Sequence, residues 1–383
     1  MGAMGLQAIV LGTGMVGTTI AVELAASGLF DNVTAVDASA EALRKCEERT
    51  AGRVSCRRVD LAEPGNLEAV LRGADVAVAA LPHSLSLRAI EAAIAARCHL
   101  VDLVGSNYPA KAALSEAARA AGVLVVPGCG VAPGITNILA GQGVLLLDEV
   151  DDLTMLCGGI PKDPLPPLGY QVVFRLESVM GLYTRPATAI VNGETVELPP
   201  LSGLEKCVFP PPIGECEAAV SDAHSTAYTL KGKVKNLVEK TVRYPGHFGK
   251  MAVLAELGFL SDKPVPTPVG PVAPKQVAMA VLEPLLRGGS HRDVTVLRVT
   301  VTGRKNGVPT TIGWEMVDFY DDAREISSMA KTTGFPAAVT AEWIAAGRLT
   351  ETGVVPPESL LIGDKFEPFM AELESKGVKV RPI

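Results

Sequence analysis

The sequence lacks several features that would assign it to a specialised class of protein. Its seven cysteines form no Cys-x-x-Cys pair, the usual sign of a structural zinc site or a redox motif. No apolar run reaches the roughly 18–20 residues of a membrane-spanning helix, and the N-terminal residues lack the pattern of a secretory signal peptide. Acidic side chains outnumber basic ones, 42 to 35, whereas nucleic-acid-binding proteins usually carry a basic excess. These absences predict a cytoplasmic protein with reduced thiols that binds neither nucleic acid nor membranes.

The chain has ample apolar material for large cores. Its 383 residues are 48% hydrophobic, and at roughly 100–200 residues per domain this length predicts about two domains. Changes of pattern along the chain place a dinucleotide-binding domain at 1–130 and a substrate and oligomerisation domain at 131–328. A C-terminal helical segment at 329–383 is expected to pack back on the first domain.

Short apolar runs alternate with helical patterns along the first 130 residues. Strands are expected at 6–11, 33–36, 54–59, 76–80, 100–103 and 123–126, with helices between them, for example at 41–48 and 108–121. This alternation predicts an α/β fold, a Rossmann-type doubly wound parallel sheet with helices on both faces.

The pattern changes after residue 130. Two pairs of β-type runs, 189–191 with 195–198 and 294–302 with 310–319, flank Asn-Gly dipeptides, which favour hairpins. Helical patterns recur at 250–258, 274–282, 336–346 and 365–376. The second domain is therefore predicted to be α+β, with a mixed or antiparallel sheet.

A glycine motif follows the first strand. Gly12, Gly14 and Gly17 form Gly-x-Gly-x-x-Gly at the start of a helical pattern. The first glycine permits a tight turn, the second lets the backbone approach a pyrophosphate, and the third lets the helix pack closely on the sheet. The helix N-terminus, with Met15 and Val16, would then direct free amides at the phosphates.

Asp37 ends the second expected strand. A carboxylate there can bind the adenosine ribose hydroxyls and would repel a 2′-phosphate, so NAD is favoured as the cofactor over NADP. The alternative is an N-cap for the next helix.

Loops at the carboxyl ends of the later strands should border the cofactor. Leu81 and Pro82 are expected to contact it. His83 is either a general acid or base or a polar loop residue near the nicotinamide ribose. Asp102 either serves the reaction, by holding an ammonium or accepting a proton, or anchors its loop. The five histidines show no i, i+4 spacing, so no metal site is expected.

Three further segments accompany the glycine motif and CGVAPG at 129–134. They are GGIPKDPLPPLGYQVVF at 158–174, TVRYPGHF at 241–248 and SMAKTTGFP at 328–336. Together they resemble the saccharopine dehydrogenase-like family, most nearly its lysine 6-dehydrogenase branch. The resemblance implies an NAD-dependent amine or amino-acid dehydrogenase. The reaction would oxidatively deaminate the ε-amine of L-lysine to 2-aminoadipate semialdehyde, which cyclises to piperideine-6-carboxylate, with release of ammonia.

The charged groups of the implied substrate are expected to bind charged residues, most of them in the second domain. Arg243 is expected to bind the substrate carboxylate, the alternative being an arginine paired on the surface. Asp102, Glu217 and Asp222 are candidates for the α-ammonium.

Other residues of the second domain have two interpretations each. Tyr170 either hydrogen-bonds substrate, in a catalytic position, or packs. His247 either lines the pocket or caps the following helix. Asp222 and Ser225, in Asp-Ala-His-Ser, are assigned to substrate binding; saccharopine-forming relatives carry Asn-Arg-Asp-Ser there. The missing arginine argues against binding saccharopine's additional carboxylates.

Two other functions remain open. One is a saccharopine- or carboxyspermidine-type dehydrogenase that reductively joins an aldehyde and an amine; the other is a non-catalytic NAD(H)-binding protein. The expected partner is a small amino-acid substrate. The sheet of the second domain offers a face or an edge for two-fold pairing, so a homodimer or higher homo-oligomer is expected.

Overall fold

A computed structural model describes residues 5–172, 176–288 and 290–383. Contacts within the chain define two compact units, each assembled from three separate segments. Unit 1 consists of the residues up to 145, residues 224–229 and residues 330–378, and unit 2 consists of residues 146–223, 230–329 and 379–383. The first unit thus extends beyond residue 130, the limit expected from the sequence.

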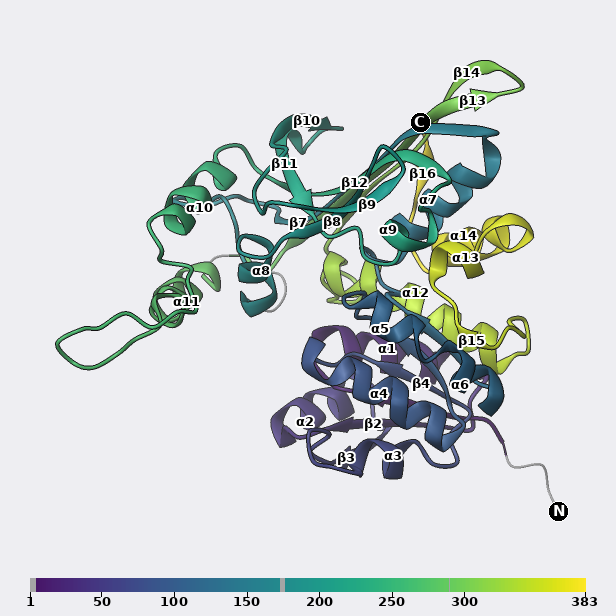
Figure 1. The fold of residues 1–383 in the computed structure, drawn as a ribbon. Helices are drawn as coiled ribbons and strands as arrows, with labels where there is room; N and C mark the ends of the chain where they lie inside the picture. The colour runs from purple at the N-terminus through teal and green to yellow at the C-terminus, as the bar shows by residue number, and fades with distance from the viewer. Residues whose placement is uncertain (1–4, 173–175, 289) are drawn as a thin grey trace. The chain divides into compact units, whose positions relative to one another are not determined.

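Unit 1 is built on a seven-stranded parallel sheet in the order β15-β6-β5-β4-β1-β2-β3. Figure 1 labels strands β2, β3, β4 and β15 of this sheet. Six of its strands lie where the apolar runs predicted them, and their order is that of a Rossmann fold. The expected doubly wound α/β architecture is confirmed. The strands are β1 (Gln7–Leu11), β2 (Asn32–Asp37), β3 (Ser55–Arg58), β4 (Val76–Ala79), β5 (His99–Asp102), β6 (Leu124–Pro127) and β15 (Gly353–Val354).

Helices accompany this sheet. The helix predicted at 108–121 is divided into α5 and α6, and α12 begins eight residues before the predicted start at 336, with Pro336 inside it. The elements are α1 (Met15–Ala26), α2 (Ala40–Arg49), α3 (Asn66–Leu71), α4 (His83–Ala96), α5 (Tyr108–Ala112), α6 (Ser115–Ala121), α7 (Ile135–Leu146), α9 (Thr226–Thr229), α12 (Ser328–Ala345), α13 (Pro357–Leu360), η1 (Gly363–Lys365) and α14 (Phe366–Ser375).

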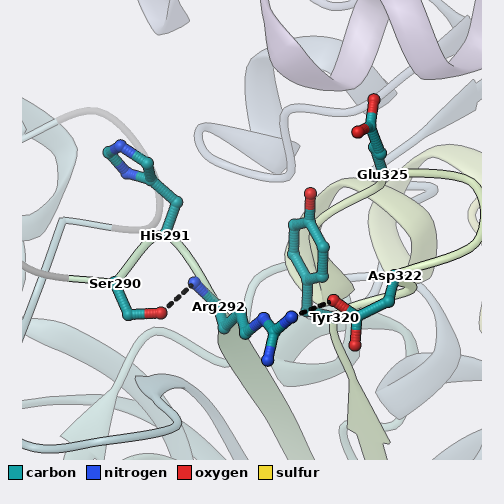
Figure 2. A pocket seen from close by; sticks show the side chains of 6 residues that line it. All are labelled: Ser290, His291, Arg292, Tyr320, Asp322 and Glu325. Atoms are coloured by element: carbon teal, nitrogen blue, oxygen red, sulfur yellow. Dashed lines mark hydrogen bonds and ion pairs between the residues drawn. The ribbon is translucent and has the colours of Figure 1, made fainter.

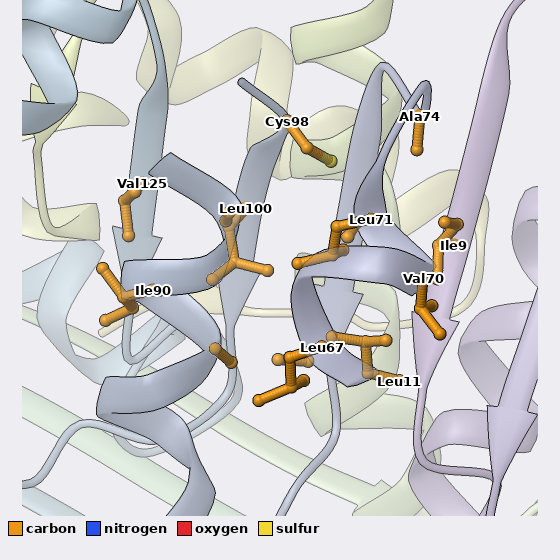
Figure 3. Close-up of a cluster of buried hydrophobic side chains, with 14 of the residues drawn as sticks. Ile9, Leu11, Leu67, Val70, Leu71, Ala74, Ile90, Cys98, Leu100 and Val125 are labelled. Atoms are coloured by element: carbon orange, nitrogen blue, oxygen red, sulfur yellow. The ribbon is translucent and has the colours of Figure 1, made fainter. Parts of the chain in front are cut away.

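One hydrophobic core of unit 1 lies between the sheet and helices α3 and α4 (Figure 3). Leu11 and Leu100 of the sheet, with Leu71 and Ile90 of the helices, are fully buried in it. Burying such side chains stabilises the fold by about 1.5–3 kcal/mol each. This packing fixes the positions of the strand ends that carry the candidate site.

Unit 2 contains a nine-stranded mixed sheet with the path β10-β11-β12-β7-β13-β14-β16, and β8 and β9 join it through β12. Only the β12–β7 pair is parallel among the strand pairs described for this unit. The strands are β7 (Glu149–Pro161), β8 (Ala187–Val191), β9 (Glu194–Leu198), β10 (Glu205–Phe209), β11 (Gly214–Ser221), β12 (Val234–Arg243), β13 (Asp293–Lys305), β14 (Val308–Phe319) and β16 (Arg381–Pro382).

Both predicted hairpins are present. Asn192 and Gly193 have φ values of 51° and 83°, and Asn306 and Gly307 have 52° and 76°. Two successive positive φ angles characterise the tight turns that match the twist of paired strands, and Asn-Gly is the sequence that adopts them most readily.

Three helices of unit 2 share one hydrophobic core: α8 (Leu176–Leu182), α10 (His247–Glu256) and α11 (Pro274–Leu286). Tyr183 and Phe248 are among its buried side chains. The ends of β7, β12 and β14 and the start of β13 lie at one edge of the sheet, because β12 is parallel to β7 and β13 runs opposite to it. Within the described ranges, no helix combines the length and the hydropathy needed to cross a membrane.

Candidate active site

The glycine motif forms the turn from β1 into α1. A Cβ atom on Gly12 would lie 2.5 Å from the Ala80 carbonyl oxygen, and one on Gly17 would lie 1.9 Å from that of Gly12, so neither position accepts a side chain. Gly12 also has a φ of 90°. A Cβ on Gly14 would meet nothing within 4 Å, so the backbone at the start of α1 faces open space.

This loop has the properties of a dinucleotide site. Gly14 is the N-cap of α1 and has no side chain to satisfy the free amides of the first turn. Thr13 is buried, and its hydroxyl oxygen has no hydrogen-bond partner among the described residues. Unsatisfied amides, a positive helix dipole and an orphaned hydroxyl fit a pyrophosphate group. The residues present therefore suit the cofactor that the motif predicts.

Asp37 lies at the end of β2, beside this loop. Its two carboxylate oxygens accept hydrogen bonds from the Thr13 amide (2.7 Å) and the Ser39 amide (2.8 Å). The side chain thus holds the glycine loop against the second strand, and each oxygen retains a lone pair for a ribose hydroxyl. Arg58, which was not predicted as a site residue, lies opposite Asp37 in the register of strands β2 and β3. Its Nε donates a hydrogen bond to the Ala38 carbonyl (3.0 Å).

The loops after β4 and β5 bring two polar side chains together. A Cβ on Gly12 would lie 3.5 Å from a methyl carbon of Leu81, which places Leu81 beside the glycine loop. Pro82 is the N-cap of α4, and His83 opens that helix. The Nδ1 atom of His83 lies 2.8 Å from the Ser106 hydroxyl. This contact fixes one ring nitrogen of His83 beside the loop that follows β5.

Asp102 is fully buried at the end of β5. Its carboxylate accepts hydrogen bonds from the Ser86 hydroxyl (2.6 Å), the Lys111 ammonium (2.8 Å) and the Val104 amide (3.1 Å). Lys111 is itself buried and also donates to the Val104 carbonyl. These contacts match the loop-anchoring alternative for Asp102. Lys111 follows Asp102 by nine residues, and no sequence pattern indicated that the two side chains would form an ion pair.

A second candidate centre lies in unit 2, where Arg243 ends β12. The Arg243 side chain is 5% exposed. Its guanidinium carbon lies 4.5 Å from the centre of the Tyr170 ring, and one nitrogen donates to the Val242 carbonyl (2.8 Å). No carboxylate of the described residues forms an ion pair with it, and its Nε is buried without a hydrogen-bond partner.

Two of the predicted residues, Tyr170 and His247, surround Arg243 together with Tyr183, which the sequence analysis missed. The rings of Tyr170 and Tyr183 lie 5.4 Å and 5.6 Å from the His247 ring. Tyr183 follows α8 in a segment with no recognisable spacing, so only its aromatic character could have drawn attention to it.

Hydrogen bonds define the tautomer of His247. Its Nδ1 lies 3.0 Å from the Leu168 carbonyl oxygen, which can only accept, so Nδ1 carries the proton. Its Nε2 then accepts from the Tyr183 hydroxyl at 2.7 Å. Burial, followed by the charge of Arg243, lowers the pKa of His247 to about 3, and burial raises the pKa of Tyr183 to about 12. The imidazole and the phenol are therefore both neutral at physiological pH, and Arg243 supplies the charge.

The carboxylates proposed for the α-ammonium have other partners. Glu217 accepts from the amides of Gly246 (2.9 Å) and Phe248 (2.7 Å), and so caps the N-terminus of α10. Glu217 thus has the capping role that was one of the two expected for His247. Asp222 accepts from the amide (3.2 Å) and the hydroxyl of Thr188.

Ser225 belongs to unit 1, where its hydroxyl accepts from the Asn137 side chain at 3.2 Å. It therefore lies in a different unit from Asp222, three residues before it in the chain.

Unit 2 also has an open polar hollow of about 520 Å³ where β13 begins and β14 ends (Figure 2). An ion pair between Arg292 and Asp322, with a distance of 2.6 Å, crosses it. The hollow lies at the same sheet edge as Arg243, but Arg243 does not line it. Its lining residues are Ser290, His291, Arg292, Tyr320, Asp322 and Glu325. No group of acidic, histidine or cysteine side chains in the described ranges has the arrangement of a metal site.

The parallel sheet and the glycine loop define the class, a protein with a Rossmann-type dinucleotide-binding domain. Comparison with family models is more specific. Residues 8–126 match the saccharopine dehydrogenase NADP binding domain, and residues 130–378 match the saccharopine dehydrogenase C-terminal domain. The chain belongs to the saccharopine dehydrogenase family, as the sequence resemblance predicted.

Individual relatives agree with this assignment. The chain is 23% identical to the saccharopine dehydrogenase [NADP(+), L-glutamate-forming] of Pyricularia oryzae, covering 83% of this chain and 86% of that protein. It is 23% identical to the protein of the same name from Saccharomyces cerevisiae, covering 97% and 98%. Bovine mitochondrial alpha-aminoadipic semialdehyde synthase is 22% identical over 82% of this chain and 41% of that protein.

Solved structures show the same fold. The apo saccharopine dehydrogenase (L-Glu forming) of Saccharomyces cerevisiae has a TM-score of 0.80 at 19% identity, covering 99% of this chain and 100% of that one. A homospermidine synthase from Legionella pneumophila in complex with NAD has a TM-score of 0.66 at 12% identity, covering 99% and 91%. The chain is thus an oxidoreductase of a family whose curated relatives are amino-acid dehydrogenases.

Proposed function

We propose that this chain is a saccharopine-type dehydrogenase, which oxidises the C–N bond of a secondary amine derived from lysine. In the oxidative direction, the amine loses a hydride from carbon and a proton from nitrogen. Water then cleaves the resulting imine into an aldehyde and a primary amino acid. The reverse direction joins an aldehyde and an amine. Family membership and the relatives' names favour this reaction over the lysine deamination that we expected from the sequence.

The structural observation that supports an amino-acid substrate, for this reaction and for the lysine deamination considered below, is the buried Arg243 guanidinium. Two other cations of unit 2 that are also less than a tenth exposed, Lys240 and Lys275, have ion-pair partners in Glu205 and Asp262. Arg243 has none among the described residues, and burial of an isolated charge is costly. A carboxylate of the substrate would supply the missing partner through two parallel hydrogen bonds.

The surrounding residues orient this cation. Tyr170 offers its ring face to the guanidinium, which adds a cation–π attraction and limits its rotation. Tyr183 gives its proton to His247 and so keeps its oxygen lone pairs available toward the positive charge. Because His247 stays neutral, it adds no second charge. We assign Arg243 to carboxylate binding, and Tyr170, Tyr183 and His247 to its orientation.

The cofactor site belongs to unit 1. The bound nicotinamide ring would accept or donate the hydride. The residues of the chain would hold it: the amides at the start of α1 would bind the pyrophosphate, and Asp37 would bind the adenosine ribose. We propose NAD, since a 2′-phosphate beside the Asp37 carboxylate would be repelled. Arg58 is the residue that would support NADP instead, the cofactor in the names of the family model and of the fungal relatives.

Oxidative deamination of L-lysine is the second candidate. Arg243 is the one buried cation of the described part of unit 2 without an ion pair, and lysine has one carboxylate. Saccharopine has three, and larger substrates of this kind need additional cations. The absence of an arginine from residues 222–225 points the same way.

One assay separates these reactions. The purified protein is incubated at alkaline pH with saccharopine or L-lysine, each with NAD or NADP, and reduced cofactor is followed at 340 nm. Release of glutamate from saccharopine would support the saccharopine-type reaction, and release of ammonia from lysine would support deamination. Turnover of neither substrate, with tight NADH binding, would contradict both and leave the non-catalytic alternative.

A further inference from the structure

A short segment of unit 1, residues 224–229, comes from between two strands of unit 2, β11 and β12. Polar side chains of α7 and α13 hold it in place. The Asn137 side chain donates to the Ser225 hydroxyl and to the Glu358 carboxylate, both at 3.2 Å. The Thr229 hydroxyl donates to the same carboxylate at 2.8 Å. The segment thus has a fixed position within unit 1.

His224 opens this segment and lies against the loops that follow β5 and β6. A Cβ atom on Gly105, in the first loop, would lie 2.4 Å from the Cγ atom of Pro133, in the second, and 3.0 Å from the Cγ atom of His224. A side chain at position 105 would therefore displace the imidazole, and glycine leaves room for it. His224 has a φ of 52°, a left-handed conformation that residues other than glycine adopt at an energetic cost. Strain of this kind is concentrated at functional sites.

The cofactor would place its nicotinamide ring at this edge of the sheet. Asp37, at the end of β2, would bind the adenosine ribose, and the turn after β1 would bind the pyrophosphate. Since the strands follow in the order β5-β4-β1-β2, the nicotinamide half would then extend over the ends of β4 and β5. His83 borders that position, with its Nδ1 atom 2.8 Å from the Ser106 hydroxyl. His224 borders it too, because it lies against the neighbouring Gly105.

We propose that His224 is a catalytic residue, which exchanges a proton with the nitrogen of the substrate amine. This inference rests on the proposed function, whether the amine is secondary or primary. A protonated amine has no lone pair to promote the loss of hydride, so the imidazole first accepts the extra proton from nitrogen. The neutral amine then gives a hydride from the adjacent carbon to the oxidised nicotinamide ring, which leaves an iminium ion and the reduced cofactor. In the reverse direction the imidazolium returns the proton to nitrogen.

The other titratable groups on the elements around His224 are less suited to this transfer. Asp102, at the end of β5, is paired with a buried lysine at 2.8 Å. Burial raises the pKa of Tyr108 to about 12, so its phenol keeps its proton near neutral pH. Glu358 is buried and accepts hydrogen bonds from neutral side chains. His83 is the competing candidate, and its substitution is therefore a separate arm of the test.

The first test measures turnover of saccharopine and L-lysine by variants of the full-length protein. His224→Ala should lower kcat by about 10²- to 10⁴-fold, the usual contribution of a general acid or base. Added imidazole should restore part of the loss, because it can occupy the space of the missing ring and carry the proton. His83→Ala should not respond to imidazole. The control is His99→Gln at the opposite end of β5, where His99 accepts a hydrogen bond from the Leu124 amide (2.9 Å); its kcat should match the wild type.

The second test does not depend on turnover. The chain has five histidines, so the NMR signals of their rings can be followed separately in protein labelled at histidine. The signal that is absent from His224→Ala identifies His224. NADH should shift this signal, and ADP-ribose, which lacks the nicotinamide ring, should shift it much less. Neither ligand should shift the signal of His99.

The outcomes separate this role of His224 from the proposed function. A His224 signal that responds alike to NADH and ADP-ribose would overturn the inference, because the residue would then lie away from the nicotinamide ring. A fully active His224→Ala, or imidazole rescue of His83→Ala alone, would also overturn it and leave the proposed function standing. A wild-type protein that oxidises neither substrate would contradict the proposed function and the proton transfer together.

Discussion

Replacement of Arg243 by methionine should weaken substrate binding without weakening the ligand-free fold. Methionine retains much of the side-chain volume and removes the charge. The guanidinium has a cation–π contact with Tyr170 and a hydrogen bond to the Val242 carbonyl, but no carboxylate partner among the described residues. The two effects of this substitution therefore have opposite signs, which makes the prediction specific.

The loss of binding follows from the contacts that a substrate carboxylate would make. Hydrogen bonds to charged groups are worth about 1.5–3 kcal/mol each, and truncation of one partner of a buried charge pair costs about 2–5 kcal/mol. For a bidentate pair, Arg243→Met should lower kcat/KM by about 10²- to 10³-fold.

The ligand-free protein should respond differently. The cation–π contact is worth up to about 2 kcal/mol, but the desolvation of a buried charge costs several kcal/mol. The melting temperature of Arg243→Met should therefore equal or exceed that of the wild type. An arginine with a structural partner would give the opposite result, because its removal would leave that partner unpaired.

Arg298 provides the matched control. Its guanidinium carbon lies 4.7 Å from the centre of the Phe209 ring, as Arg243 lies over Tyr170, but Arg298 is paired with Glu315. Arg298→Met should lower the melting temperature and leave kcat/KM unchanged. Steady-state kinetics with saccharopine and lysine, and thermal unfolding of the free proteins, measure both quantities. An Arg243→Met enzyme with unchanged kcat/KM, or one clearly less stable than wild type, would refute the assignment.

Three further predictions concern other residues. Asp37→Ser should lower the preference for NAD over NADP at least about ten-fold, since one charge near the 2′-position is removed; equal preference before and after the change would disprove the assignment of Asp37. The depressed pKa of His247, about 3 against an ordinary 6.5, means that the unfolded state binds a proton first as the pH falls. The stabilising effect of the neutral imidazole is complete above pH 6.5 and decreases below it, by about 1.4 kcal/mol per pH unit. The unfolding free energy of His247→Gln, measured in urea, should thus depend less on pH between 6.5 and 4 than that of wild type. Asp102→Asn leaves Lys111 as an uncompensated buried charge and should cost about 3–5 kcal/mol of stability; an unchanged melting temperature would argue instead for the catalytic role.

The fold of unit 1 could be predicted from the sequence because its signals are local. A buried parallel strand is a short apolar run, and Gly12 and Gly17 of the β1–α1 turn are required by contacts below 3 Å. The Asn-Gly turns of unit 2 were predictable for the same reason, since both residues must adopt positive φ. The short strand β15 has no such pattern, and it joins the sheet of unit 1 through contacts with β6, far away in the sequence.

The candidate site was less predictable because it depends on contacts between distant residues. Arg243, Tyr170 and His247 were selected through the family resemblance, and the structure places them together. Nothing in the sequence indicated that Tyr183 donates to His247, across 64 positions, or that Lys111 neutralises Asp102. The cap of α10 illustrates the same limit, because Glu217 reaches it from β11, thirty positions earlier in the chain.

The interleaved construction of the two units has a consequence for how the chain folds. Unit 1 takes residues 224–229 from the middle of the chain, and unit 2 takes strand β16 from residues 381–382, which pair with β14. Neither unit is therefore complete when the ribosome has made only its first segment, because each also needs residues from much later in the chain. Strand pairings over such long separations are slow to form, because loop-closure entropy opposes them. Expression of the first 145 residues alone would yield a sheet that lacks strand β15, so the structure favours the intact chain as the cooperative unit of folding.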